Sequence, residues 1–468
     1  MRTFSREHRS LLLTLIALAG PIALQNLIGS SLNLVDNVMI GRLGEASIAG
    51  VALANQVFFL LVLYSFAIGS GTAIFTAQYW GKGDTSAIRR SLGLCLVAMF
   101  GGALLFFAAC QCAPGRLIAL FSPDPQVIDI GGRFLRIVSW GFLFQAITIS
   151  YVSVLRSVES VRMPLVASVI SLAVNTVLNW MLIFGHCGLP ALGVEGSAIA
   201  TVIARVLEAS IVLGAVYGRG WLRGRRHVLA AGLRELFGFS REYARQFVAI
   251  TWPVVANEVG WALGVTCAAA VFAHMSTEAI AAFNIADTAI KLVIVVFFGT
   301  TNANAIIVGK QIGEGNDEHA FATARFFAIV APLVGVLLGA VLAGVSSLLP
   351  LAFNVTPTVR EWAAVAMIIF AVDMPLRVFN WHVIVGILRA GGDTRYSMVL
   401  DVGGTWLVSV PLCALTGLVL GMPFWVVYVA SLLEDVPKVF MGIARLRSRK
   451  WLNNLTRDSG PSLTAASA

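Results

Sequence analysis

Long apolar runs are the feature that most restricts the fold of this chain. Stretches of 20 or more mostly apolar residues recur roughly every 35–40 residues, and each is long enough to cross a hydrocarbon core about 30 Å thick as a helix. Only 12% of the residues are charged and the mean hydropathy is +0.85, which is too little charge for the surface of a soluble protein. The sequence therefore predicts an all-α polytopic membrane protein.

The apolar runs predict about twelve transmembrane helices in two six-helix lobes related by pseudo-symmetry. They lie near residues 12–40, 47–77, 88–110, 128–154, 164–185, 193–217, 246–272, 279–309, 321–348, 360–387, 396–417 and 423–444.

The loops between these runs differ in charge. Lys and Arg collect in alternate loops, most densely between residues 218 and 245, which indicates that those loops are cytoplasmic. Both termini then lie in the cytoplasm, and we expect a multi-pass protein of a bacterial inner membrane. The net charge of +9 is explained by this asymmetry and by contact with anionic lipid, so we expect no nucleic-acid partner.

The two halves of the chain resemble each other. At an offset of 232, Pro21 aligns with Pro253, and ten of the 63 positions that follow without a gap are identical. "VLRSVESVR" (154–162) and "ILRAGGDTR" (387–395) match at an offset of 233. We therefore predict an N-lobe (1–217), a basic cytoplasmic linker (218–245), a C-lobe (246–450) and a flexible cytoplasmic tail (451–468).

Two repeated lobes are typical of a secondary transporter with its substrate path between them. The sequence contains no Walker A, HExxH or GxSxG motif, so we predict neither an ATP-driven pump nor an enzyme. Uphill transport would then use an ion gradient, and acids inside the membrane become the candidate sites.

Asp36 is the acid of the first span. It is either paired with Arg42 at the membrane surface or binds a proton or Na⁺. Asn175 and Asn179 lie four residues apart, hence on one helix face of the fifth span, and Thr201 lies in the sixth. Carboxylate, amide and hydroxyl oxygens suit Na⁺, although small polar residues also join neighbouring helices by hydrogen bonds.

The second half carries different acids. Glu258 aligns with Asn26, while Asp36 aligns with Ala268, so the acids are not repeated. We interpret Glu258 as a site for a cationic substrate or a coupling ion. Asp373 and Asp287 each precede a cation by four residues, which predicts either a structural ion pair or an ion site.

These residues resemble the multidrug and toxic compound extrusion (MATE) family. The resemblance covers about residues 10 to 450 and depends on "PIALQNLIGSSLNLVDNVMIGRLGE" (21–45), "GILRAGGDTR" (386–395) and the two-lobe plan. It implies an antiporter coupled to Na⁺ or H⁺ that exports drugs or other amphipathic organic cations by alternating access.

The resemblance also implies roles for individual residues. Asp36, Asn175, Asn179 and Thr201 become the ion-coupling set, with Na⁺ as a candidate metal, and Pro21 becomes a bending point of the first helix. Some members carry Asp where this chain has Asn179. Members that use an acid in the tenth span carry it closer to "GILR" than Asp373.

Two other functions stay open. A flippase for lipid-linked precursors or polysaccharides from the same superfamily would need more cations in its spans than this chain has, and a non-transporting membrane scaffold would not need acids within the spans. We expect a monomer in the lipid bilayer that requires no cofactor other than its coupling ion.

Overall fold

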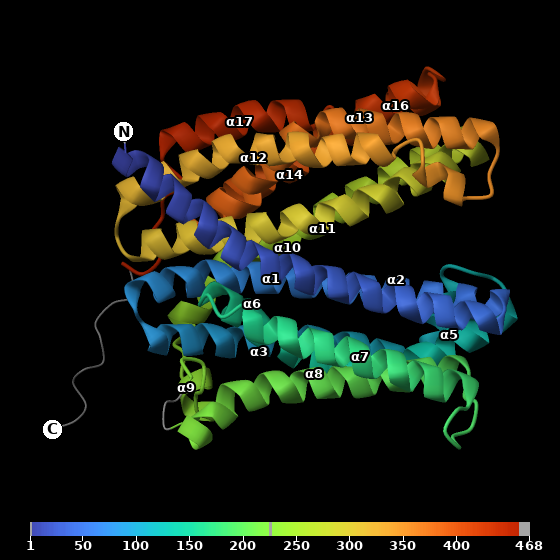
Figure 1. Cartoon of the computed structure of the whole chain (residues 1–468), viewed down its shortest axis with the longest axis horizontal. Coiled ribbons are helices and arrows are strands. Elements are labelled where there is room, and N and C mark those ends of the chain that lie inside the picture. The colour runs from blue at the N-terminus through green and yellow to red at the C-terminus, as the bar shows by residue number, and fades with distance from the viewer. Residues whose placement is uncertain (1, 224–226, 458–468) are drawn as a thin grey trace. The chain divides into compact units, whose positions relative to one another are not determined.

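The chain folds into helices and connecting loops. A computed structural model describes residues 2–223 and 227–457, and within these ranges it contains no strand (Figure 1). The predicted all-α fold is confirmed.

The helices match the predicted membrane spans closely. In the described part of the chain, ten helices are long and apolar enough to cross a membrane. The pair α5 (Pro125–Val138) and α6 (Trp140–Ser157), bent by 47°, adds an eleventh. The last predicted span coincides with two shorter helices, α16 (Phe424–Leu432) and α17 (Asp435–Ser448).

Many large apolar side chains point away from the protein. Leu105 is 71% exposed, Val372 75% and Leu407 79%, each on a helix of the predicted membrane region. Apolar surface of this extent marks a membrane-facing surface. The protein is therefore a multi-pass membrane protein.

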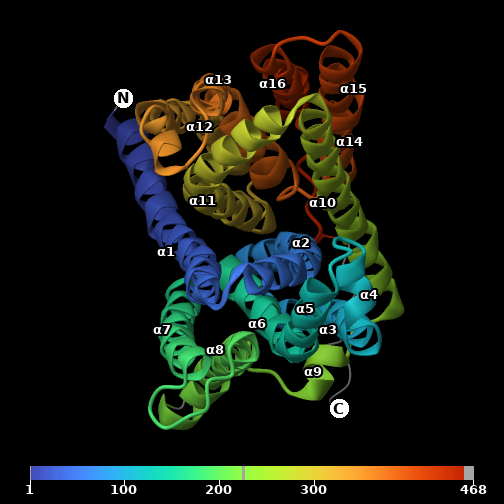
Figure 2. The same ribbon diagram turned by 90° about the vertical axis from the view of Figure 1, so that its right-hand side faces the viewer.

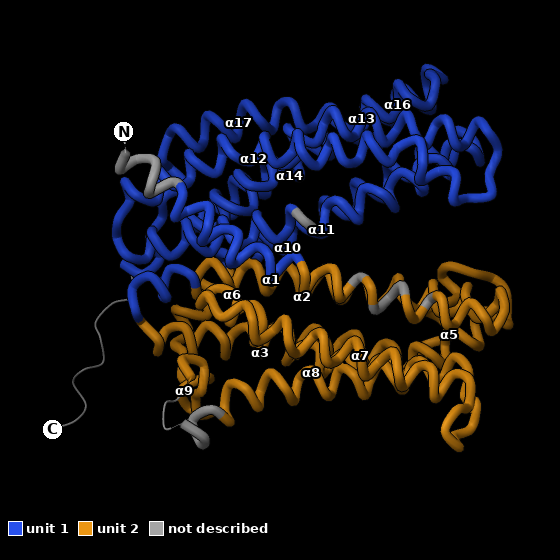
Figure 3. Tube along the Cα trace, viewed as in Figure 1, with its two compact units in different colours: residues 1–23, 77–83, 249–468 blue, residues 24–76, 84–248 orange. Residues whose placement is uncertain are grey.

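The chain forms two compact units (Figure 3). Unit 1 contains residues 1–23, 77–83 and 249–468, and unit 2 contains residues 24–76 and 84–248. The helices α1, α2 and α10 each contribute to both units. The lobe boundaries predicted from the internal repeat are drawn on sequence similarity and stay a prediction.

Unit 2 is built mainly from helices of the first half of the chain. Its elements are the second part of α1 (Arg2–Ile40), η1 (Gly41–Leu43), most of α2 (Glu45–Lys82), α3 (Thr85–Cys112), α4 (Pro114–Ala119), α5, α6, α7 (Arg162–Phe184), α8 (Val194–Arg223), α9 (Leu233–Phe237) and the start of α10 (Arg241–Met275).

Close packing in unit 2 depends on small residues. A Cβ atom on Gly93 of α3 would lie 1.8 Å from the carbonyl oxygen of Leu236, so only glycine admits α9 at this place. The helices α7 and α8 also lie side by side, joined by a turn that contains Gly185 in the left-handed conformation (Figure 2). This pairing brings the polar faces of α7 and α8 together.

Unit 1 contains the second half of the chain. Its elements are the first part of α1, the end of α2, most of α10, α11 (Thr277–Gly313), α12 (Asp317–Val345), η2 (Leu349–Ala352), α13 (Pro357–Trp381), η3 (His382–Leu388), α14 (Thr394–Gly404), η4 (Thr405–Ser409), α15 (Val410–Ala414), η5 (Leu415–Val419), α16 and α17. Among these, η3, η4 and η5 are π-helical turns.

An apolar core joins the helices of unit 1. The rings of Phe272, Phe283, Phe424 and Tyr428 stack or meet edge to face between α10, α11 and α16. The helices α11, α12 and α13 pack side by side (Figure 2), and a Cβ atom on Gly339 of α12 would lie 2.4 Å from a carbonyl oxygen of α13. This packing holds α13 and its charged residues inside the unit.

The end of the chain corrects one expectation. Residues 451–468 are predicted above to be a flexible tail, but residues 451–457 pack into unit 1. Trp451 is fully buried, and Gln78 donates to the Asn453 carbonyl oxygen and accepts from the Leu455 amide. The rest of the predicted tail, 458–468, lies outside the described residues.

Candidate functional site

Asp36 lies one turn before the end of α1, within unit 2. Asn179 of α7 donates a hydrogen bond from Nδ2 to the Asp36 carboxylate. The same Nδ2 donates to Asn175 Oδ1 at 3.1 Å, and Asn175 Nδ2 is 3.5 Å from the Thr201 hydroxyl oxygen. The structure thus brings together the four residues for which the sequence predicts an ion-coupling role.

The helix α7 can offer these amides because of their spacing. Asn175 and Asn179 are both fully buried on the face that α7 presents within unit 2. Two amides at this separation stack along one helix face, and burial requires their polar atoms to find partners. The side-chain oxygen of Asn179 has no hydrogen-bond partner in the described part of the chain. The site therefore contains one acceptor that is not yet used.

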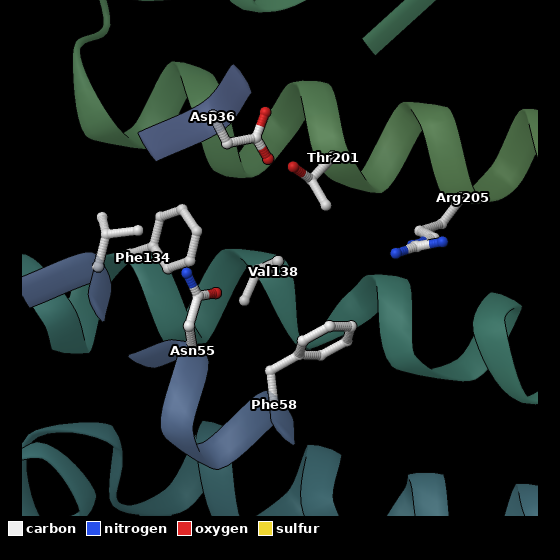
Figure 4. A pocket seen from close by; sticks show the side chains of 8 residues that line it. Asp36, Asn55, Phe58, Phe134, Val138, Thr201 and Arg205 are labelled. Carbon is white, nitrogen blue, oxygen red and sulfur yellow. The ribbon is translucent and has the colours of Figure 1, made fainter. Parts of the chain in front are cut away.

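A small cavity opens beside Asp36 (Figure 4). Thr201 and Arg205 of α8 point into it, one turn apart, and apolar side chains form much of the wall. The lining residues are Asp36, Val51, Asn55, Phe58, Phe134, Val138, Thr201 and Arg205. Asp36 is therefore an acid that faces a mostly apolar cavity shared with one cation.

Arg205 is held in place by a series of polar contacts outside the cavity. Its guanidinium lies 3.1 Å from Glu208 of the same helix, and Ser168 of α7 donates to Glu208 at 2.8 Å. Gln25 of α1 donates to Ser168 at 3.1 Å and accepts from Arg156 at 2.6 Å. This series of contacts joins α1, α6, α7 and α8, so the cavity has a rigid polar support.

Sequence reasoning missed Arg205 as part of the site. One signal was available, because Arg205 is a cation inside an apolar run and follows Thr201 by four residues. Asp36 accepts a hydrogen bond from Asn179 and faces the cavity that contains Thr201 and Arg205. Arg42, the partner proposed for Asp36 at the membrane surface, lies exposed in η1.

The arrangement around Asp36 can bind a small cation or a proton. A carboxylate away from bulk water is stabilised by donated hydrogen bonds and by opposite charge, and it exchanges these for a bound proton or metal ion. Asn179 turns its N–H donor toward Asp36. Of the four residues, Asp36 and Thr201 line the cavity, so their oxygens are exposed to an entering ion.

The acids predicted in the second half lie in unit 1. The Glu258 carboxylate is 2.9 Å from the guanidinium of Arg389, which is almost fully buried. The pairs predicted from the i, i+4 spacing are both present: Asp373 lies 3.0 Å from Arg377, and Asp287 lies 2.6 Å from Lys291. The Lys291 side chain is 72% exposed, whereas Asp373 and Arg377 are buried.

Pro21 lies inside α1, which continues as a helix on both sides of it. A proline within a helix removes one backbone hydrogen bond and favours a bend. The position agrees with the expectation of a flexible point, although the bending itself stays a prediction.

The family follows from comparison with known proteins. The model of the MatE family matches residues 21–181 and 259–415, which together are more than half of the chain. The chain belongs to the MatE family. The first matched segment contains Asp36, Asn175 and Asn179, and the second contains Asp287 and Asp373.

Relatives of this MatE protein extend over most of its length. The probable multidrug resistance protein NorM of Thermotoga maritima is 23% identical over 85% of this chain and 84% of its own. The multidrug resistance protein MdtK of Yersinia enterocolitica is 25% identical over 91% of this chain and 90% of its own. A solved MOP-superfamily transporter from Pyrococcus furiosus has a TM-score of 0.82, at 18% identity over 93% of this chain and 95% of its own, which shows the same fold.

Proposed function

We propose that this MatE-family protein is a secondary active transporter that exports drugs or other amphipathic organic cations. It exchanges them for H⁺ or Na⁺ by alternating access across a bacterial inner membrane, with both termini in the cytoplasm. The membrane fold and the relatives that are named as multidrug resistance proteins support the substrate class.

The observation that carries the coupling role is the environment of Asp36. An acid joined by hydrogen bond to Asn179 and facing a cavity of mostly apolar walls is costly unless it is used. Binding of H⁺ or Na⁺ at Asp36 changes the charge at the cavity. The hydrogen bond from Asn179 is thereby weakened, and the packing of α1 against α7 is biased toward a second arrangement.

The apolar walls and the Asp36 carboxylate also suit the proposed substrates, while Arg205 holds the one positive charge of the lining. Phe58, Phe134 and Val138 offer apolar and aromatic contact to a greasy cation, and aromatic faces attract positive charge. The neutralised Asp36 would release such a cation, so binding of the ion and binding of the substrate exclude each other. That exclusion is what an antiporter requires.

The test is transport in membrane vesicles or proteoliposomes. A fluorescent organic cation is loaded, and a pH gradient and a Na⁺ gradient are imposed separately. We expect an inward gradient of one of the two ions to drive export, and the reversed gradient of the same ion to slow it. Export at the same rate with neither gradient would contradict a coupled antiporter, and transport of a lipid-linked precursor alone would favour a flippase.

A further inference from the structure

A buried network of charges lies in unit 1, apart from Asp36. Arg377 of α13 contacts Asp373 at 3.0 Å and Asp435 of α17 at 2.6 Å. Lys438 of α17 contacts Asp401 of α14 at 2.8 Å and Glu434 at 3.1 Å. The guanidinium of Arg377 is also 3.9 Å from Glu434, so the two groups form one network.

The network contains more acids than cations. Four carboxyl groups (Asp373, Asp401, Glu434 and Asp435) face two cations, Arg377 and Lys438, and the most exposed of the six side chains is only 18% exposed. If every group were ionised, the net charge inside the membrane region would be −2. An uncompensated buried charge is strongly unfavourable, so the network must hold additional positive charge.

The surrounding charged groups do not remove this excess. Glu258 and Arg389 form a neutral pair on the side of Asp401, and Asp287 and Lys291 form another on α11. The other titratable neighbours from the elements around α13 are the Tyr428 hydroxyl of α16 and His382 of η3, whose Nδ1 is 2.8 Å from the Val378 carbonyl oxygen.

The contacts indicate where one of the two excess negative charges lies, and a proton bound there lowers the net charge of the network from −2 to −1. Asp401 is bound by Lys438 and by Asn257 at 3.0 Å, and Glu434 is bound by Lys438 and by the Thr405 hydroxyl at 2.6 Å. By contrast, Asp373 and Asp435 share the one guanidinium of Arg377, at 3.0 and 2.6 Å, which holds their carboxyl groups close to each other. Two carboxyl groups held on one cation repel each other strongly when both are ionised.

An unpartnered acceptor lies beside this pair. Asn380 is 1% exposed, and its Nδ2 donates to Asp435 Oδ1 at 2.7 Å. Its Oδ1 has no hydrogen-bond partner in the described part of the chain. A buried amide oxygen next to an acid calls for an O–H donor, which a protonated carboxyl group supplies.

We propose that Asp373 and Asp435 bind one proton between them on Arg377, as a proton site of unit 1 separate from Asp36. The proton enters from solvent and returns to it, and no other group changes its covalent state. The π-helical turn η3 follows α13 directly, and such turns are frequent at functional sites. The site stands on unit 1 alone, and its use in export rests on the proposed function.

Infrared spectroscopy of the purified, full-length protein tests the site. The background is Asp36→Asn, so that Asp36 does not contribute, in Na⁺-free buffer near neutral pH. We expect the carbonyl stretching band of a protonated carboxyl group. Labelling aspartate with ¹³C at the side-chain carboxyl group should shift this band, because its source is an aspartate and not Glu434.

Variants then assign the band. Asp373→Asn in the same background should abolish it, whereas Asp401→Asn, a matched acid of the same network with two partners, should retain it. Absence of the band, a band that the aspartate label does not shift, or a band unchanged by Asp373→Asn would each overturn the proposal. The labelling arm requires no variant in the network and so holds even if Asp373→Asn does not fold.

Sodium provides a further arm. Added Na⁺ at constant pH should leave the band in place, and its loss would mean that a metal ion replaces the proton, which overturns a proton site. None of these measurements depends on transport. If the Asp36→Asn protein shows the band but the wild-type protein exports nothing, the proposed function alone is contradicted.

Discussion

Asn179 donates a hydrogen bond to the carboxylate of Asp36, although the two residues are 143 positions apart in the chain. The bond joins the last turns of α1 to the second-last turn of α7 inside unit 2. Any event that neutralises Asp36 therefore acts directly on the contact between two helices. The predictions for unit 2 begin from this bond.

Replacing Asp36 by Asn should abolish coupled export while leaving the amount of protein in the membrane unchanged. The amide keeps the size of the side chain but neither carries the negative charge nor binds a proton in its place. Export of a fluorescent organic cation from cells should fall to the level of cells without the transporter. Protein amount is measured in the same cells by quantitative immunoblot.

Asp129→Asn is the matched control for this variant. Asp129 is also an aspartate of unit 2, but it is 67% exposed and lies 2.9 Å from the exposed Arg133. An exposed ion pair contributes little, so export should stay at the wild-type rate. Normal gradient-driven export by the Asp36→Asn protein would contradict the coupling role.

Replacing Asn179 by Leu should weaken unit 2 and slow export. The substitution removes the hydrogen bond to Asp36 and leaves Asn175 Oδ1 without its donor. Hydrogen bonds to charged groups contribute about 1.5–3 kcal/mol, and the free energy of unfolding should fall by about this amount. Thermal unfolding in detergent measures the change.

The control for Asn179 is Asn55→Leu. Asn55 lines the cavity beside Asp36 but is only partly buried. We expect a smaller loss of thermal stability than for Asn179→Leu. Equal losses of thermal stability in the two variants would show that the hydrogen bond from Asn179 to Asp36 does not stabilise unit 2.

Contacts within one helix are the part of the site that the sequence predicts well. Asn175 and Asn179 share a face, and the pairs Asp373–Arg377 and Asp287–Lys291 form, because residues four apart on a helix are neighbours whatever surrounds them. The all-α membrane fold is predictable for a similar reason, since the length of each apolar run is a local property.

Contacts between helices are the part that the sequence does not predict. The partners Glu258 and Arg389 are far apart in the chain, and Asp435 and Asp373 meet at Arg377 only after α13 packs against α17. The tail also depends on packing, because its hydrophilic residues look mobile until Trp451 is seen to be buried. Such contacts follow from the arrangement of whole helices and have no signature in spacing.

Replacing Trp451 by Ala should destabilise unit 1. The indole is fully buried and donates to the Leu446 carbonyl oxygen at 3.1 Å, while Gly391 leaves the space in which the Trp451 backbone lies. Truncation of a buried Trp costs about 3–5 kcal/mol, and we expect a clearly lower melting temperature in detergent.

Trp425→Ala is the matched control for Trp451. Trp425 belongs to the same unit but is 52% exposed on α16. Its loss should change the melting temperature in detergent much less. A similar decrease for both variants would mean that the segment 451–457 contributes nothing specific to unit 1.

Replacing Arg377 by Ala should be among the most damaging single changes in unit 1. Removing the guanidinium leaves Asp373 and Asp435 facing each other without a shared cation. Breaking a buried ion pair by removing one partner costs about 3–5 kcal/mol, which thermal unfolding in detergent measures.

Arg395→Ala, which removes an exposed cation of the same unit, is the control and should have little effect on thermal stability. Acid conditions should restore part of the stability of the Arg377→Ala protein, because a second proton neutralises the carboxylate that has lost its cation. A loss that is the same at every pH would indicate that Arg377 acts through packing alone.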